Sequence, residues 1–473
     1  MSTTTVATRR QPLRSAGLAW WPLMVILCGV TARATMSSLQ LGCSLALLVL
    51  TVGAYVRSRS AGLAALFAIW LITPFVRRVL AIDGGYPRAD PLSLLPFAAT
   101  AILIILDLRR GRLSRRARRM LLLAALGYLV GVPMGLLAAP TSMAYAFFTY
   151  LIAVGAFVLG YREPFDERRF TLGRVLTLTL PVISIYGIRQ YFPPLPQWDA
   201  TWLQVTNLVT ASSPQSGHPR VFSTLNSPAT FAMVAGVAMI ALLTTRRFDA
   251  LRILGLVLVA VALALSYVRG AWLGVAVALV ALIFAGRGRA ARRVGFVLTV
   301  LVVTVPVLAA HSTTGSAVLS RVDTFGGLGS DTSAKARIAT PSQIVPIAIS
   351  NPLGVGVGQA GEATKLGASQ TLRYSDNAYL ALLYQTGPFG FLLVLWSLGA
   401  GIRRAWRNVR RTNGNVDLTV FGSIVMLLVG MLTSDLLYGV TGIMLWYLIG
   451  VAVRRDEAGV SARPGAKAQV ESV

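Results

Sequence analysis

The sequence predicts an all-α membrane protein, a polytopic bundle of about 12 to 14 transmembrane helices with a large extracytoplasmic loop. Of its 473 residues, 55% are hydrophobic and only 13% are charged, and the mean hydropathy is +0.67. Soluble domains carry about 25% charged residues. The apolar residues also form long uncharged runs, for example at 92–106, 254–266 and 272–284. Because about 20 such residues cross the hydrocarbon core, composition and run length together favour membrane spans over a soluble fold.

Candidate spans follow one another along almost the whole chain. In chain order they are 16–32, 37–56, 60–76, 92–106, 120–138, 143–160, 173–190, 229–245, 251–266, 270–286, 294–310, 377–402, 417–434 and 438–453. If two neighbouring short segments are half-helices or one hairpin, about 12 crossings remain.

The arginines predict the orientation of these spans. With the N-terminus in the cytoplasm, 31 of the 44 Lys and Arg residues fall in cytoplasmic segments, 12 fall outside, and Arg174 lies within a span. The richest cytoplasmic segment holds seven arginines between Asp107 and Met120. Short loops rich in Lys and Arg stay in the cytoplasm. The pattern therefore predicts an even number of crossings of the cytoplasmic (inner) membrane, with both termini inside.

The arginine-rich cytoplasmic loops account for most of the net charge of +27. Basic loops orient the helices and lie against anionic lipid headgroups, so membrane lipids rather than nucleic acid are the expected partners. The predicted organisation is a cytoplasmic tail (1–16), N-terminal transmembrane helices (17–190), a second transmembrane region (191–453) and a cytoplasmic C-terminal tail (454–473). The second region contains the two longest external loops, 191–228 and 311–375.

Charged residues beside these external loops are the candidates for chemistry. Arg220 and Arg269 each lie close to a membrane boundary on the same predicted face. An Arg near hydrocarbon usually faces a partner or a cavity, although it also snorkels to headgroups. A guanidinium binds phosphate through a fixed fork of donors. Asp376 and Asn377 open the span at 377–402, and an acid there is either a helix cap or a general base.

A glycine-rich stretch, NPLGVGVG at 351–358, allows two interpretations. Backbone N–H groups in such a loop cradle phosphate in some proteins, but the Gly-Lys-Ser/Thr ending of a P-loop is absent from the sequence. The other interpretation is a tight turn that returns the loop to the membrane.

Taken in order, these segments resemble the superfamily of bacterial O-antigen ligases and O-antigen polymerases. The resemblance rests on RVFSTLNSP at 220–228, SYVRGAWLG at 266–274, NPLGVGVG at 351–358, and DNAYL at 376–380 followed by GPFG at 387–390. Their order, spacing and shared external face carry the resemblance, which covers about 220–390.

The resemblance implies a membrane glycosyltransferase of surface polysaccharide biosynthesis. It implies a polyprenyl-diphosphate-linked glycan as donor, a glycan acceptor, and catalysis on the outer face without a metal or other cofactor. In the family, arginines bind the diphosphate, which implies this role for Arg220 and Arg269, with Arg337 as a third candidate. We expect Arg269 and Asp376 to be catalytic residues, and Arg220, Asn226, Arg321, Arg337 and Asn377 to bind substrate. Arginines in fixed positions would stabilise the negative charge that develops on a diphosphate leaving group.

The chain departs from the family at the expected base. Ligases typically carry His where this chain has Asp376, and a carboxylate with its usual pKa near 4 is a weaker base unless its site raises that pKa. The departure favours a polymerase or a transferase with another acceptor, and His218 is an alternative base. A membrane transporter, either a flippase or a solute carrier, is the second functional hypothesis.

Overall fold

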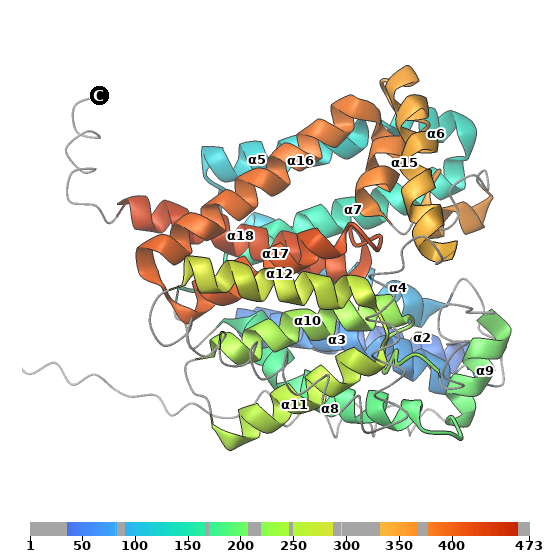
Figure 1. The fold of residues 1–473 in the computed structure, drawn as a ribbon, viewed down its shortest axis with the longest axis vertical. Helices are drawn as coiled ribbons and strands as arrows, with labels where there is room; N and C mark the ends of the chain where they lie inside the picture. Colours follow the sequence, from blue (N-terminus) through green and yellow to red (C-terminus); the bar gives the residue numbers. More distant parts are fainter. Residues whose placement is uncertain are drawn as a thin grey trace, which may run out of the picture.

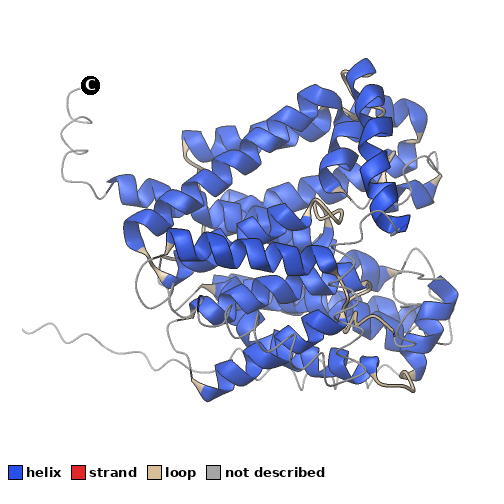
Figure 2. Cartoon of the chain, viewed as in Figure 1, coloured by secondary structure: helices blue, strands red, loops and turns tan. Residues whose placement is uncertain are grey.

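The computed structural model describes residues 36–80, 82, 90–165, 170–206, 219–245, 249–286, 295, 332–367 and 377–461. Apart from short connections, these residues are helical, as Figure 2 shows. The helices are α2 (Met36–Arg57), α3 (Arg59–Leu80), α4 (Pro91–Arg109), α5 (Arg115–Leu129), α6 (Val132–Ala138), α7 (Pro140–Tyr161), α8 (Thr171–Tyr191), α9 (Gln197–Thr206), α10 (Pro228–Thr244), α11 (Ala250–Leu265), α12 (Arg269–Ala285), α15 (Thr332–Ser350), η3 (Gly361–Leu366), α16 (Ala378–Thr412), α17 (Asn415–Gly430) and α18 (Gly439–Ser461).

The predicted all-α membrane bundle is confirmed. Within the described residues, seven helical segments are long and apolar enough to cross a membrane, and four shorter apolar helices (α10, α11, α12 and α17) accompany them. Each predicted span from 37–56 to 270–286, and each from 377–402 to 438–453, coincides with described helix. The predicted spans 16–32 and 294–310 lie outside the described residues, apart from residue 295.

Two spans are less regular than the sequence indicates. The segment predicted at 120–138 is broken between α5 and α6, where Gly131 packs so closely on Gln385 that a Cβ would lie 2.3 Å from its carbonyl oxygen. Helix α16 contains Gly387 in the left-handed region (φ 63°), directly before Pro388. A residue with positive φ before a proline interrupts the regular hydrogen-bond ladder and produces a kink.

Glycines let the central helices approach closely. A Cβ on Gly160 of α7 would lie 1.8 Å from the carbonyl oxygen of Tyr447 in α18, and one on Gly450 of α18 would lie 2.1 Å from that of Phe157. Small residues at helix contacts are typical of membrane bundles, where close packing drives association. Helix α10 is buried on nearly every side, which places it in the interior of the bundle.

The helices run between two ends of different character (Figure 1). The arginine-rich end contains the helix termini near 57–59, 109–115, 161–171 and 412–415, where Arg59 pairs with Asp107 at 2.9 Å and Arg411 with Asp456 at 2.8 Å. At the opposite end, here called the loop end, lie α6, α9 and α15, on the right in Figure 1. The connections at 219–227, 266–268, 351–367 and 431–438 are also at the loop end.

Candidate functional site

Arg220 is fixed against the turn that presents Arg269. Its Nε donates to the carbonyl oxygen of Ser266 at 3.0 Å, and its Nη2 donates to that of Tyr267 at 3.1 Å. The backbone N–H of Val221 adds a bond to the carbonyl of Leu265 at 3.2 Å. Arg269 is the first residue of α12 and is partly exposed. The two predicted phosphate-binding arginines therefore lie at one junction, between the 219–227 connection and the α11–α12 turn.

The start of helix α16 lies beside the same junction, because the 431–438 connection contacts both the start of α12 and the start of α16. A Cβ on Gly270 would lie 1.7 Å from Oγ1 of Thr433, so the start of α12 is in close contact with this connection. The N–H of Ala378 donates to the carbonyl of Met431 at 2.9 Å. The structure thus brings the starts of α12 and α16 to one short segment at the loop end.

Asn377 is the N-cap of α16. Its side-chain oxygen accepts from the N–H groups of Tyr379 at 3.0 Å and Leu380 at 3.2 Å. Capping satisfies two N–H groups that have no partner within the helix. Among the described residues, Asn377 therefore fills the capping position of α16.

The other predicted site residues are described in part or not at all. Asn226 lies at the loop end, with its Oδ1 buried and without a hydrogen-bond partner among the described residues. Arg321, Asp376 and the alternative base His218 lie outside the described residues. Arg337 lies on α15, but its side chain is outside what the structure describes. The roles of all these residues stay predictions.

A buried ionic network, which the sequence analysis does not identify, holds the segment that carries Arg220 and Asn226. Arg78 of α3 is fully buried, and its Nε pairs with Oδ1 of Asp199 at 2.9 Å. Its Nη1 donates to the carbonyl of Leu225 at 2.5 Å, and its Nη2 donates to that of Ser223. Gln190 donates to Asp199 at 2.6 Å and accepts from the N–H of Ser223 at 2.6 Å. This network fixes Ser223 in the left-handed region, at φ 52°.

We expect Arg78→Ala to lower the free energy of unfolding by about 3–5 kcal/mol, because it leaves the Asp199 carboxylate buried without its cation. Thermal unfolding of the purified protein in detergent measures the loss. Arg252→Ala is the control, because Arg252 forms an exposed pair with Asp249 at 3.2 Å. We expect Arg252→Ala to lower the free energy of unfolding by about 0.5 kcal/mol or less. Equal melting temperatures for Arg78→Ala and the wild type would show that the network does not stabilise the fold.

The glycine-rich segment 351–358 is a tight turn. Its backbone N–H groups are already used: Val355 donates to Tyr384 at 2.9 Å, Gly356 to Gln385 at 3.2 Å and Val357 to Gly131 at 3.0 Å. The N–H of Gly358 donates to Oε1 of Gln385 at 2.8 Å. A phosphate cradle needs free N–H groups, so the turn interpretation is confirmed and this segment is structural.

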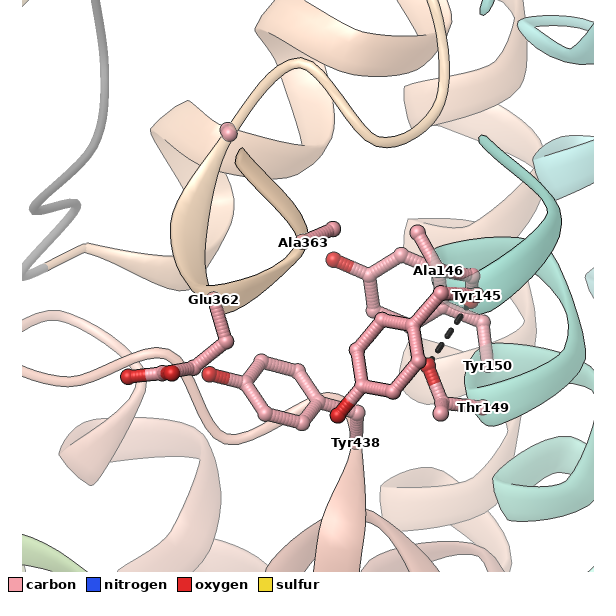
Figure 3. Close-up of a pocket in the computed structure, with 8 residues that line it drawn as sticks. Tyr145, Ala146, Thr149, Tyr150, Glu362, Ala363 and Tyr438 are labelled. Carbon is pink, nitrogen blue, oxygen red and sulfur yellow. Dashed lines mark hydrogen bonds between the residues drawn. The ribbon is translucent and has the colours of Figure 1, made fainter. Parts of the chain in front are cut away.

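A pocket opens at the loop end between α7, η3 and the connection before α18. It contains about 200 Å³ of empty space, counting the part open to solvent. Figure 3 shows Tyr145, Thr149 and Tyr150 of α7 on one side, with Tyr438 beside them and Glu362 of η3 opposite. Tyr150 also receives a hydrogen bond from Nε2 of Gln385 at 3.1 Å.

Asp435 lies beside this pocket and is the second group that the sequence analysis misses. Both of its carboxylate oxygens are buried, and the backbone of Leu437 donates a hydrogen bond to the carboxylate. Its Oδ2 lies 3.0 Å from the position that a Cβ on Gly361, at the start of η3, would take. Burial raises the pKa of Asp435 from 3.8 to about 7; the hydrogen bond from Leu437 opposes this rise, and the negative charge of Glu362 adds to it.

This pKa makes stability depend on pH. Between about pH 4 and 7 the folded protein keeps the Asp435 proton while the unfolded chain has released it, so stability falls as pH rises through this window. Asp435→Asn stays neutral, and we expect it to be more stable than the wild type at pH 8 by up to about 4 kcal/mol. The measurement compares melting temperatures at pH 5 and pH 8.

Asp249→Asn is the control for this comparison, because Asp249 is exposed at the arginine-rich end and asparagine also caps helices. We expect the control to follow the wild type at both pH values. A difference between Asp435→Asn and the wild type that is the same at pH 5 and pH 8 would contradict a raised pKa.

Comparison with known families supports the resemblance for part of the chain. Residues 254–395 match the family model described as "O-Antigen ligase". The match covers less than a third of the chain and includes the segments 266–274, 351–358 and 376–390, while 220–228 precedes it. No curated protein matches the chain. The matched segment is thus similar to membrane proteins that ligate or polymerise glycans in surface polysaccharide biosynthesis.

Proposed function

We propose that the protein is a glycosyltransferase that polymerises or transfers polyprenyl-diphosphate-linked glycan units on the outer face of the cytoplasmic membrane. One observation carries the proposal: the guanidinium of Arg220 is bound to the carbonyls of Ser266 and Tyr267, in the turn that leads directly into Arg269. The two arginines are thereby held at one junction, beside the start of α16.

Such a junction suits a diphosphate leaving group. As the glycosidic bond breaks, negative charge develops on the diphosphate oxygens, and guanidinium groups already fixed in place stabilise it without reorganisation. The carbonyl bonds of Arg220 restrict its side chain, which lowers the entropy lost on binding. The Asn226 amide completes the site from the same connection, and Arg321 and Arg337 contribute from the large loop.

The acceptor hydroxyl needs a base, and Asp376 is the proposed one. It directly precedes Asn377 in the sequence, and the side chain of Asn377 caps α16. With the usual carboxyl pKa near 4, a carboxylate is ionised at neutral pH and able to accept a proton. Its basicity is lower than that of the histidine typical of the family.

The loop end is the outer face in this proposal. The arginine-rich end then lies in the cytoplasm together with both termini, as the positive-inside rule requires. Donor and acceptor glycans meet at the loop end, close to the headgroups, and the polyprenyl chain stays in the bilayer.

The test is transfer by the purified protein. The protein is reconstituted in liposomes with a polyprenyl-diphosphate oligosaccharide, and glycan chain length is followed by gel electrophoresis. We expect longer chains, or transfer to an added acceptor glycan, with release of polyprenyl diphosphate. Movement of the donor across the bilayer with no new glycosidic bond would contradict the proposal and support a flippase instead.

A further inference from the structure

We propose that helices α5 and α16 together bind one anionic phospholipid with two phosphates at the arginine-rich end of the bundle. Each helix holds one phosphate with its arginines, and the acyl chains lie along the apolar residues farther into the membrane. This site is at the opposite end from the arginine junction, so it does not depend on the proposed transferase function.

Helices α5 and α16 are antiparallel neighbours, side by side at the top of Figure 1. A Cβ on Gly127 of α5 would lie 2.7 Å from Cγ2 of Val394 in α16, so the two helices pack closely. Nearer the arginine-rich end, Nη1 of Arg404 lies 3.8 Å from Sδ of Met120. Met120 and Arg404 therefore belong to the sides with which the two helices face each other.

Helix geometry then places two arginines on the same side of this pair. Successive residues of an α-helix are rotated by about 100° around its axis. In two antiparallel helices that face each other, the residues directly before the contact positions point to the same side of the pair. Arg119 directly precedes Met120, and Arg403 directly precedes Arg404, so both arginines lie on that side.

Residues three, four, seven or eleven positions away along each helix share this side and complete what we call the α5–α16 face. All of its side chains are exposed: Arg115, Arg119, Leu122 and Leu126 on α5, and Leu392, Trp396, Arg403, Arg407 and Arg410 on α16. On each helix the arginines lie at the arginine-rich end and the apolar side chains lie farther into the bundle.

This order matches the structure of a phospholipid, whose phosphate lies at the membrane surface and whose acyl chains lie in the hydrocarbon. A guanidinium binds phosphate through two donors in a fixed fork, and basic sites between transmembrane helices bind anionic lipid headgroups. The arrangement occurs twice, on packed helices whose axes are about 8–10 Å apart. A lipid with two linked phosphates, each with its own acyl chains, therefore fits the face as a single ligand.

The arginines of the α5–α16 face also lack the counter-charges that their neighbours have. At the same end, Arg411 pairs with Asp456 at 2.8 Å and Arg455 pairs with Asp417 at 2.6 Å. None of the five arginines of the face forms an ion pair with the residues that the structure describes. They stand three or four positions apart on each helix, where like charges repel. A lipid with two phosphates supplies the missing negative charge.

The experiment measures lipid binding to the full chain, purified in detergent and stripped of lipid. The probe is diphosphatidylglycerol, and native mass spectrometry follows the bound fraction during a titration. We expect the double variant Arg119→Gln with Arg403→Gln to raise the Kd for the first bound lipid about 30-fold, the effect of losing two arginine contacts at a membrane surface. Both substituted side chains are exposed, so the variant should melt at the wild-type temperature.

The matched control is Arg174→Gln with Arg252→Gln, which removes the same charge from the same end of the bundle. Arg174 is exposed on α8 and Arg252 lies on α11, and these two helices pack together on the opposite side of the bundle, at the bottom of Figure 1. Charges separated by more than a Debye length are largely screened, so we expect the Kd of the control to stay within about twofold of the wild type.

Three results would overturn the proposal. The first is a folded Arg119→Gln, Arg403→Gln variant that binds the probe as tightly as the control does. The second is phosphatidylglycerol, with one phosphate, binding as tightly as the probe, since the two helices would then not act as one site. The third is a short single-stranded RNA that binds more tightly than the probe and loses this affinity in the same variant, which would assign the face to nucleic acid.

Discussion

Arg269→Ala is expected to lower kcat/KM for glycan transfer by about 100- to 1,000-fold, the loss typical of one preorganised group that stabilises an oxyanion. The loss should appear mainly in kcat, since the leaving-group charge is fully developed only in the transition state. Arg269→Lys should recover part of the activity, because an ammonium keeps the charge but loses the two-donor fork. Steady-state kinetics with the lipid-linked donor measures all three proteins.

Arg189→Ala is the matched control for this prediction. Arg189 is also an arginine at the loop end, but its guanidinium is exposed and donates to the carbonyls of Phe192 at 2.7 Å and Pro194 at 3.2 Å. We expect less than a twofold change in kcat/KM for this variant, since exposed contacts contribute about 1 kcal/mol or less. If Arg269→Ala is folded and as active as the control, Arg269 does not bind the diphosphate.

The second large effect is expected at Asp376. Asp376→Asn removes the proposed base without changing the size of the side chain, and general-base catalysis contributes about 100- to 10,000-fold. Transfer should therefore fall by at least about 100-fold in kcat, while donor and acceptor binding stay close to wild type.

Histidine, which is typical of the family at this position, should restore activity when it replaces Asp376. Asp376→His introduces a base with a usual pKa near 6.5, so we expect this variant to transfer glycan and its rate to rise between about pH 5.5 and 7.5. If Asp376→Asn retains full activity, another group accepts the proton, and Asp435, with its pKa near 7, would be the next residue to replace.

Most of the fold follows from the sequence because lipid imposes a strong and simple constraint. Backbone groups in hydrocarbon must be satisfied within the span, so a long apolar run is a helix. The predicted spans from 37–56 onward therefore match helices wherever the structure describes them. The breaks at Gly131 and Gly387 do not follow from hydropathy, because they depend on tertiary contacts, of Gly131 with Gln385 and of Gly387 with Pro352.

Residues of the candidate site can be predicted from the sequence only where they lie in a recognisable motif. The position of Arg220 beside the turn before Arg269 agrees with the predicted convergence of the two arginines on one face. Arg78 was hidden from sequence analysis because an arginine at the end of an apolar run also suits snorkelling, and its buried partner Asp199 is 121 positions away. Asp435 could not be identified from the sequence, because its burial is a property of the packed loop end and not of its neighbours in sequence.

The most direct test of the central claim is an experimental structure of the protein bound to polyprenyl diphosphate. We expect diphosphate oxygens within about 2.7–2.9 Å of guanidinium nitrogens of both Arg220 and Arg269, at the junction of the 219–227 connection and α12. A diphosphate bound at the arginine-rich end, or at the loop end without contact to either arginine, would contradict it.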